Sequence, residues 1–235
     1  MPSFIKALKS QVGRKYVTGI TGVFLMLFLI GHLGGNLTIF AGVHTFNNYT
    51  HHLENLGPLL YVIELVLAFL FIYHAVLGIS IARNRKKARP ESYNVYKTKG
   101  GPSHQTLASR SMAITGVIIL VFLVIHIWQF KFGFGEELAR YTHEGVDLPQ
   151  LRARVIEAFT NPVSAFGYAF VLAMIILHLS HGFWSAFTSL GMKHGETSKK
   201  VQAAAYVFAI VLMLGFMFIP LYIFFTGGDG SLISY

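Results

Sequence analysis

The sequence predicts an all-α integral membrane protein, a bundle of five transmembrane helices forming one membrane domain over residues 1–235. The chain is 54% hydrophobic and only 12% charged, which is too apolar for an ordinary soluble domain of this length. Five stretches are long enough to cross a bilayer, and Glu64 is the sole charged residue inside them. A bundle of buried soluble helices is the alternative, but such helices rarely stay free of charge over about 20 residues.

The five predicted helices cover residues 16–41, 58–82, 111–130, 162–190 and 201–226. The first follows a basic start, as a secretory signal does, but its apolar stretch is longer than a signal core and His32 lies inside it. The second and fourth begin with Pro58 and Pro162, where a missing N–H costs nothing. Pro220 falls late in the fifth and is expected only to kink it.

The segment before the fourth helix shows a helical spacing of apolar residues. Leu148, Leu151, Val155 and Phe159 would share one face of a short helix. Such a helix would either lie on the membrane surface or pack under the loop, and the sequence leaves both open.

The placement of charge predicts the orientation. Of 19 Lys and Arg residues, 15 fall at the N-terminus, between residues 83 and 110, or between residues 193 and 200. By the positive-inside rule these segments are cytoplasmic, so the N-terminus is expected inside and the C-terminus outside the cytoplasmic (inner) membrane. The same placement argues against binding to nucleic acid.

Five histidines lie inside the predicted helices, which is costly unless they have a function, and four of them lie at similar depths. His32, His74, His126 and His178 each sit about 24 Å beyond the face where their helix enters the membrane. Because successive helices alternate in direction, His32 and His126 fall near the outer face, and His74 and His178 near the inner one. The two levels should differ by on the order of 10 to 20 Å.

Two opposed imidazoles suit the iron of a low-spin haem, and the lack of an open coordination position favours electron transfer. With no cysteine in the chain, thiolate-bound clusters and c-type haem attachment are excluded. The sequence therefore predicts a bundle enclosing two haems b. The neighbouring glycines leave room for a flat macrocycle, although close helix packing also explains them; they are Gly31, Gly34, Gly35, Gly78 and Gly182.

His181 competes with His178 as the ligand on the fourth helix, but it lies nearer the membrane interface. It is instead expected to bond a haem propionate or a partner subunit. The remaining histidines are predicted to lie in loops; they are His44, His51, His52, His104, His143 and His194.

Four motifs in this order carry a resemblance to a known family. They are Phe28-Leu29-Ile30-Gly31-His32, Ile72-Tyr73-His74-Ala75-Val76, Val124-Ile125-His126-Ile127-Trp128 and Leu177-His178-Leu179-Ser180-His181-Gly182-Phe183-Trp184. Together they resemble the dihaem cytochrome b membrane anchor, of the b558 type, of succinate:quinone oxidoreductases (succinate dehydrogenases and fumarate reductases). The resemblance implies that His32 and His126 bind the distal haem, and that His74 and His178 bind the proximal one.

The resemblance also implies partners and a substrate. A flavoprotein and an iron–sulfur protein are expected on the cytoplasmic side, and a dimer of the whole complex is a further expectation. Arg83 to Arg89 would form a docking surface, although the positive-inside rule explains these charges equally well. Membrane quinone, most often menaquinone in this family, is expected to react near the distal haem. The chain itself is expected to perform no flavin or dicarboxylate chemistry.

Candidate residues for the quinone and its protons are Glu64, Glu54, His51 and His52, which lie near the predicted outer face. A structural hydrogen bond is the other explanation for Glu64. Possible propionate partners at helix ends are Lys15, Arg110 and Lys131.

One position departs from the family. Some fumarate-reducing members carry Glu two residues before the fourth ligand, where this chain has Ile176, so protons are expected to exchange on the outer side. Two other classes share parts of the pattern. One is the cytochrome b anchor of a hydrogenase or formate dehydrogenase, and the other is a non-haem protein such as a di-iron desaturase or a metal transporter.

Overall fold

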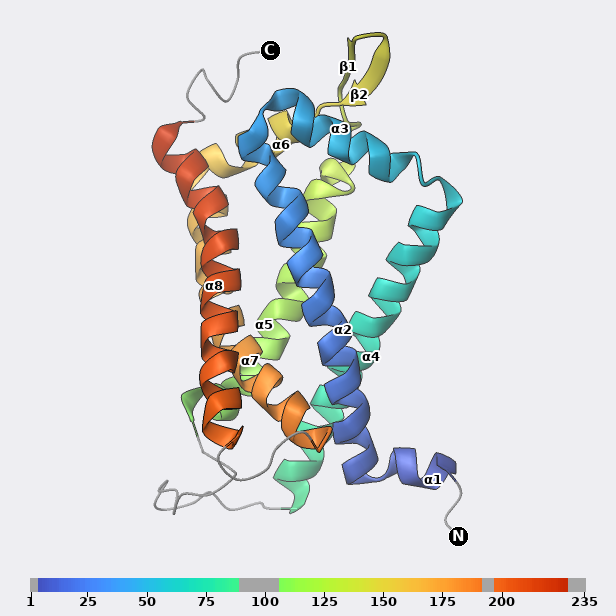
Figure 1. Cartoon of the computed structure of the whole chain (residues 1–235), viewed down its shortest axis with the longest axis vertical. Helices are drawn as coiled ribbons and strands as arrows, with labels where there is room; N and C mark the ends of the chain where they lie inside the picture. The colour runs from blue at the N-terminus through green and yellow to red at the C-terminus, as the bar shows by residue number, and fades with distance from the viewer. Residues whose placement is uncertain (1–3, 89–105, 192–196, 228–235) are drawn as a thin grey trace. The chain divides into compact units, whose positions relative to one another are not determined.

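The computed structural model of the chain describes residues 4–88, 106–191 and 197–227. Figure 1 traces its elements. In chain order they are α1 (Phe4–Lys9), α2 (Gln11–Leu37), η1 (Thr38–Ala41), α3 (Val43–Glu54), α4 (Pro58–Ala88), α5 (Leu107–Phe130), η2 (Gly133–Gly135), β1 (Arg140–His143), β2 (Val146–Pro149), α6 (Leu151–Thr160), α7 (Pro162–Ser189) and α8 (Thr197–Thr226).

Five helices among the described residues are long and apolar enough to cross a membrane, which confirms the predicted all-α membrane fold. They are α2 with η1, α4, α5, α7 and α8. Several extend beyond the predicted bounds, and α4 continues to Ala88 rather than residue 82. Lys and Arg are good helix formers, and their apolar stems let the charged ends reach water. The helix therefore continues beyond its apolar stretch.

The chain divides into two compact units, and each long helix contributes a segment to both. The first unit comprises Met1–Leu27, Leu67–Ile118 and Met174–Val211. The second unit comprises Phe28–Val66, Ile119–Ala173 and Leu212–Tyr235. A single membrane domain over the whole chain therefore stays a prediction.

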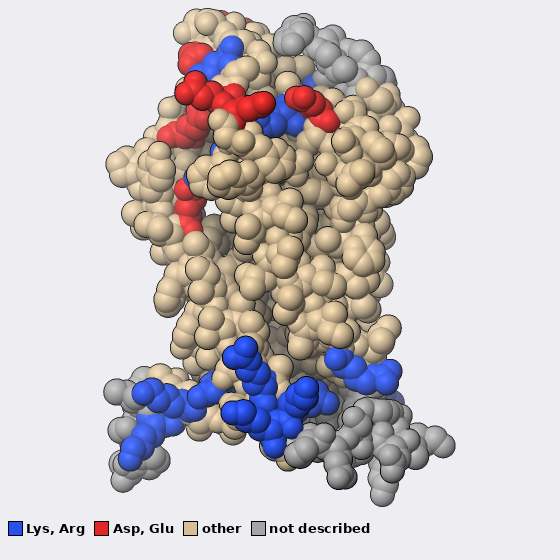
Figure 2. All heavy atoms as spheres, turned by 180° about the vertical axis from the view of Figure 1, so that it is seen from behind, with Lys and Arg blue, Asp and Glu red and all other residues tan. Residues whose placement is uncertain are grey.

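Small residues allow the helices of the first unit to approach closely. A side chain at Gly19 would meet the Ala186 backbone at 3.4 Å, and Ala205 and Ala209 are fully buried. In this unit Lys and Arg side chains gather around helix ends, beside a surface of uncharged residues (Figure 2). Four of them end α4 as Arg83, Arg85, Lys86 and Lys87.

The start of α7 follows the local rules for helix N-termini. The side-chain Oδ1 of Asn161 accepts hydrogen bonds from the backbone N–H groups of Val163 at 2.8 Å and Ser164 at 3.4 Å. Pro162 occupies the first helical position, where no N–H is needed. Pro220 lies inside α8, which continues past it to Thr226.

The second unit contains structure between the long helices that the sequence did not predict. Helix α3 and the hairpin β1–β2 lie where loops were expected, so the prediction that His44, His51, His52 and His143 lie in loops was wrong. His104 and His194 lie outside the described residues. The hairpin turns at Glu144 and Gly145, both with positive φ (47° and 78°), as a two-residue turn between twisted strands requires.

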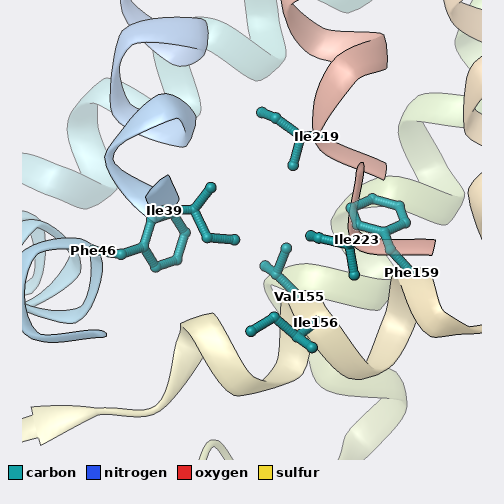
Figure 3. Close-up of a cluster of buried hydrophobic side chains, with 7 residues drawn as sticks. All are labelled: Ile39, Phe46, Val155, Ile156, Phe159, Ile219 and Ile223. Atoms are coloured by element: carbon teal, nitrogen blue, oxygen red, sulfur yellow. The ribbon is translucent and has the colours of Figure 1, made fainter. Parts of the chain in front are cut away.

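Helix α6 packs against protein, which decides between the two interpretations of its apolar face. Val155, Ile156 and Phe159 are buried with residues from three other elements, η1, α3 and α8 (Figure 3). The full cluster is Ile39, Phe46, Val155, Ile156, Phe159, Ile219 and Ile223. Leu148 precedes the helix, in β2, and is also buried.

Two buried polar residues fix α6 to α3 and η1. The backbone N–H of Arg152 donates to Asn47 Oδ1 at 3.0 Å, and its Nε donates to the Ile39 carbonyl at 3.2 Å. Burial lowers the pKa of Arg152 from its usual value. Hydrogen bonds of this kind offset the cost of burying polar groups.

Candidate functional site

The structure brings four of the five intramembrane histidines together as two pairs, the same two that the sequence predicted. In the first unit, the rings of His74 on α4 and His178 on α7 have centroids 6.4 Å apart. In the second unit, the rings of His32 on α2 and His126 on α5 have centroids 5.9 Å apart. The ring planes meet at 64° and 87°. Each pair thus joins two helices that are distant in sequence.

The spacing of each pair fits one metal ion held between two imidazoles. An imidazole nitrogen binds a metal ion at about 2.0–2.1 Å, so rings on opposite sides of one ion have centroids about 6 Å apart. Among residues 4–88, 106–191 and 197–227, no group of three or more His, Asp or Glu side chains is placed to hold a metal ion. A haem provides the remaining nitrogens itself and needs only an axial pair from the protein.

Threonine hydroxyls contact both rings of the first pair. Thr21 Oγ1 on α2 lies 3.1 Å from His74 Nδ1, and Thr115 Oγ1 on α5 lies 3.1 Å from His178 Nδ1. Both threonines are buried, with 5% and 1% of their surface exposed. The Nδ1 atoms are therefore engaged, which leaves Nε2 of each ring for a metal.

Glycines let the same two rings approach the neighbouring helices. A Cβ at Gly22 would lie 3.3 Å from His74 Cε1, and one at Gly116 would lie 3.4 Å from His178 Cε1. Thr21-Gly22 and Thr115-Gly116 therefore form two equivalent Thr-Gly contact sites, one for each ring of the first pair.

Aromatic side chains surround the second pair. Phe28 and Phe122, each one turn before a ligand, stack on His32 at 5.3 Å and on His126 at 5.6 Å between centroids. The Tyr168 hydroxyl donates to Gln129 Oε1 at 2.9 Å and lies 3.3 Å from His126 Nδ1. Further rings against this pair are those of Phe216 and Phe130.

His32 has a different polar neighbour. The side-chain amide of Asn36, one turn later on α2, donates to the His32 carbonyl at 2.7 Å. The same nitrogen lies 3.4 Å from His32 Nδ1, a distance too long for a strong hydrogen bond. The second pair is thus held mainly by packing of rings.

The space beside the ligands matches the room that a flat group requires. A Cβ added at Gly31, Gly34, Gly78 or Gly182 would meet no protein atom within 4 Å. Helix α4, which carries His74, has no buried residue. Gly35 differs from this set, because the ring of Tyr49 fills the position that a side chain would take.

The structure favours His178 over His181 as the residue opposite His74. His181 lies one turn along α7, with its ring centroid 5.9 Å from that of Trp184. Its side chain lines a first-unit pocket with five other residues, which are Thr106, Ser180, Trp184, Gln202 and Tyr206.

The candidate proton-transfer residues lie in the second unit, and the two carboxylates among them are paired with basic side chains. Glu64 on α4 forms an ion pair with Lys131, and the Lys131 amine also lies 5.8 Å from the Tyr61 ring centroid. Glu54 Oε2 accepts a hydrogen bond from Arg140 at 3.2 Å. The structure therefore joins Lys131, predicted as a propionate partner, to the predicted proton carrier.

Four further candidates lie at helix ends. His51 Nε2 lies 3.0 Å from Asn55 Nδ2 at the end of α3, and His52 is exposed beside it. Lys15 and Arg110 are exposed near the starts of α2 and α5. Of the docking segment Arg83 to Arg89, Arg89 lies outside the described residues.

Sequence reasoning missed the residues that contact the Nδ1 atoms, namely Thr21, Thr115 and Tyr168. A signal for two of them is present: Ile20-Thr21-Gly22-Val23 recurs as Ile114-Thr115-Gly116-Val117. In each copy the threonine precedes an intramembrane histidine of its own helix by eleven residues. Eleven residues make about three helical turns, so threonine and histidine share one face.

Comparison with known proteins gives one relative. Over 189 residues the chain is 27% identical to the succinate dehydrogenase cytochrome b558 subunit of Bacillus subtilis (strain 168), which covers 80% of this chain and 82% of the relative. No protein-family model matches the chain. No solved structure matches it. The relative confirms the family resemblance that the four histidine motifs indicated.

Proposed function

We propose that the chain is the cytochrome b membrane subunit of a succinate:quinone oxidoreductase, and that it passes electrons between an iron–sulfur subunit and membrane quinone. The observation that carries the proposal is the pair of facing imidazoles in each unit, 6.4 Å and 5.9 Å apart between centroids. Similarity to a cytochrome b558 subunit supports the choice of haem b over another metal site.

His74 and His178 would hold one haem b, and His32 and His126 the other. When bound, each haem supplies reversible one-electron chemistry at its iron. The two histidines of each pair would hold the iron, which would leave oxygen and substrate no place at the metal. Burial of the rings among apolar helices keeps water from the Nδ1 hydrogen bonds.

Quinone chemistry moves protons together with electrons, so it needs a carboxylate or a similar group within reach. The described residues of the first unit include no Asp or Glu, whereas the second unit contains Glu54 and Glu64. We assign the quinone reaction to the second unit, with Glu64 as the proton carrier and with Glu54, His51 and His52 exchanging protons with solvent. Ile176 in the first unit has no titratable group, which supports this choice.

The basic helix ends of the first unit support a cytoplasmic orientation by the positive-inside rule. The iron–sulfur and flavoprotein subunits would bind on that side. The His74 and His178 haem would then be the one that exchanges electrons with the iron–sulfur subunit. The quinone is proposed to be menaquinone.

The test is purification of the chain from its native membrane under mild conditions. The expected preparation contains a flavoprotein and an iron–sulfur protein, two haems b per chain, and succinate- or fumarate-linked activity with quinones. Assays with low- and high-potential quinones show which one serves. A preparation with the two haems but with hydrogenase or formate dehydrogenase subunits would support another quinone-linked anchor, and one without haem would refute both.

A further inference from the structure

We propose that Thr21 and Thr115 are positioning residues for the His74 and His178 pair. Each hydroxyl accepts a hydrogen bond from the Nδ1–H of its histidine. This bond fixes the tautomer whose Nε2 is free for iron. The same two hydrogen bonds lower the reduction potential of the haem held there. This inference rests on the proposed function and assigns residues that the histidine motifs do not contain.

The direction of each hydrogen bond follows from where the hydroxyl proton goes. Thr21 Oγ1 donates to the carbonyls of its own helix, at 3.0 Å from Val17 and 3.1 Å from Thr18. With its one proton directed to these carbonyls, the hydroxyl is left to accept from His74 Nδ1 at 3.1 Å, and the Thr18 carbonyl also accepts a hydrogen bond from the His74 ring.

Thr115 repeats this arrangement on α5. Its Oγ1 donates to the carbonyls of Ser111 at 3.1 Å and Met112 at 3.2 Å, and His178 Nδ1 lies 3.1 Å away. An accidental contact would not recur with the same donor, acceptor and local sequence on a second helix.

Burial gives these two bonds their effect. Both threonines are nearly inaccessible to solvent, so no water competes for the imidazole proton. A hydrogen bond from Nδ1–H to an acceptor makes the ring a better electron donor to a metal. Greater donation favours the oxidised iron and therefore lowers the reduction potential.

The second pair lacks this symmetric arrangement. There Tyr168 accepts from His126 Nδ1 at 3.3 Å, while the neighbour of His32 is the amide nitrogen of Asn36, a donor. Variants at the two threonines should therefore change one haem, and a variant at Tyr168 should change the other.

The experiment uses the intact complex with Thr21→Val, Thr115→Val and the double variant, because valine matches threonine in shape but has no hydroxyl. Redox titration of the reduced haem bands should show a positive shift of the same component in both single variants and a larger shift in the double variant. Thr21→Ser and Thr115→Ser should stay near the wild-type potential. Tyr168→Phe should shift the other component.

Thr188→Val is the matched control. It also removes a hydroxyl from a first-unit helix, but this hydroxyl donates to the Trp184 carbonyl at 2.8 Å. It should leave both potentials unchanged. Equal potentials in wild type, Thr21→Val and Thr115→Val would overturn the inference, as would shifts of different components in the two single variants.

Haem content separates this inference from the proposed function. A wild-type complex with fewer than two haems per chain would refute the proposed function, whereas two haems with unmoved potentials would refute only the role of the threonines. Should a valine variant fail to assemble, the alanine and serine variants at the same position decide by the same titration: alanine shifts the potential and serine does not.

Discussion

The two histidine pairs share their ligand type but differ in what surrounds them. His74 and His178 pack against the Thr-Gly contact sites, where a hydroxyl lies at hydrogen-bond distance from each Nδ1 and a glycine contacts each ring edge. His32 and His126 rest among phenylalanines, with a tyrosine hydroxyl on one side only. Two sites that each held a metal with two histidines would therefore differ in electron donation to that metal, because the neighbouring atoms set this property.

The surroundings also differ in their charged groups. All described carboxylates lie in the second unit, and the described residues of the first unit offer only bases and neutral polar groups. The second pair thus lies in the unit that contains Glu64, the proposed proton carrier.

The largest effect is expected from replacing a histidine of either pair, because it tests whether the two pairs are separate haem sites. Replacing any one of the four histidines by leucine should reduce bound haem from two to one per chain, since each iron needs both axial ligands. His74→Leu combined with His178→Leu should still retain one haem, whereas His74→Leu combined with His126→Leu should retain none. Haem content per chain, measured as the pyridine haemochrome, checks both results.

His181→Leu is the matched control for the histidine variants, because it removes an intramembrane histidine outside both pairs. It should retain two haems. If the His74 and His178 double variant lost both haems, the assignment of these residues to one common site would be wrong.

A smaller effect is expected at Glu64, and it sharpens the assignment of proton transfer to the second unit. Glu64→Gln removes the proton carrier and should lower quinone-linked turnover roughly 100-fold, as is typical for loss of a general acid or base. Both haems should remain. Steady-state rates with a quinol or quinone analogue measure the change.

Lys131→Met breaks the same ion pair but leaves the carboxylate in place. It should retain most of the turnover. Equal losses in Glu64→Gln and Lys131→Met would show that the ion pair has a structural role and that Glu64 does not carry the proton.

The smallest effect concerns the hairpin of the second unit. Arg140 donates to Asp147 Oδ2 at 2.5 Å. This bond is the main cause that raises the pKa of Arg140, and the neighbouring Glu54 carboxylate raises it further. A raised pKa of Arg140 stabilises the fold at every pH below the ordinary arginine pKa, and this contribution is lost only as the pH rises above it. Asp147→Asn should therefore lower the thermal stability of the protein in detergent by the same amount at pH 6 and at pH 9.

Because Arg140 and Asp147 are exposed, the loss should be under about 1 kcal/mol and should shrink further in salt. A loss that grew between pH 6 and pH 9 would contradict the assigned direction of the pKa shift.

The sequence by itself determined the five spans and which histidines face each other. Both follow from local properties: the length of an apolar stretch fixes where a helix crosses, and counting residues from its start fixes the depth of His32, His74, His126 and His178. Because successive helices alternate in direction, only His32 with His126 and His74 with His178 lie at equal depth, so only this pairing is possible. Lipid-facing and buried positions are equally apolar here, so hydropathy says little about the rotation of each helix.

Only the tertiary structure decided what touches the ligands. That Thr21 meets His74 and Thr115 meets His178 depends on how the helices are rotated and packed, which residue spacing within one helix does not specify. The ion pair of Glu64 with Lys131 likewise joins residues from two helices. Helix α3 and the hairpin escaped prediction because Phe46, Leu148 and Asn47 are stabilised by burial against distant segments, and that burial exists only once the chain has folded.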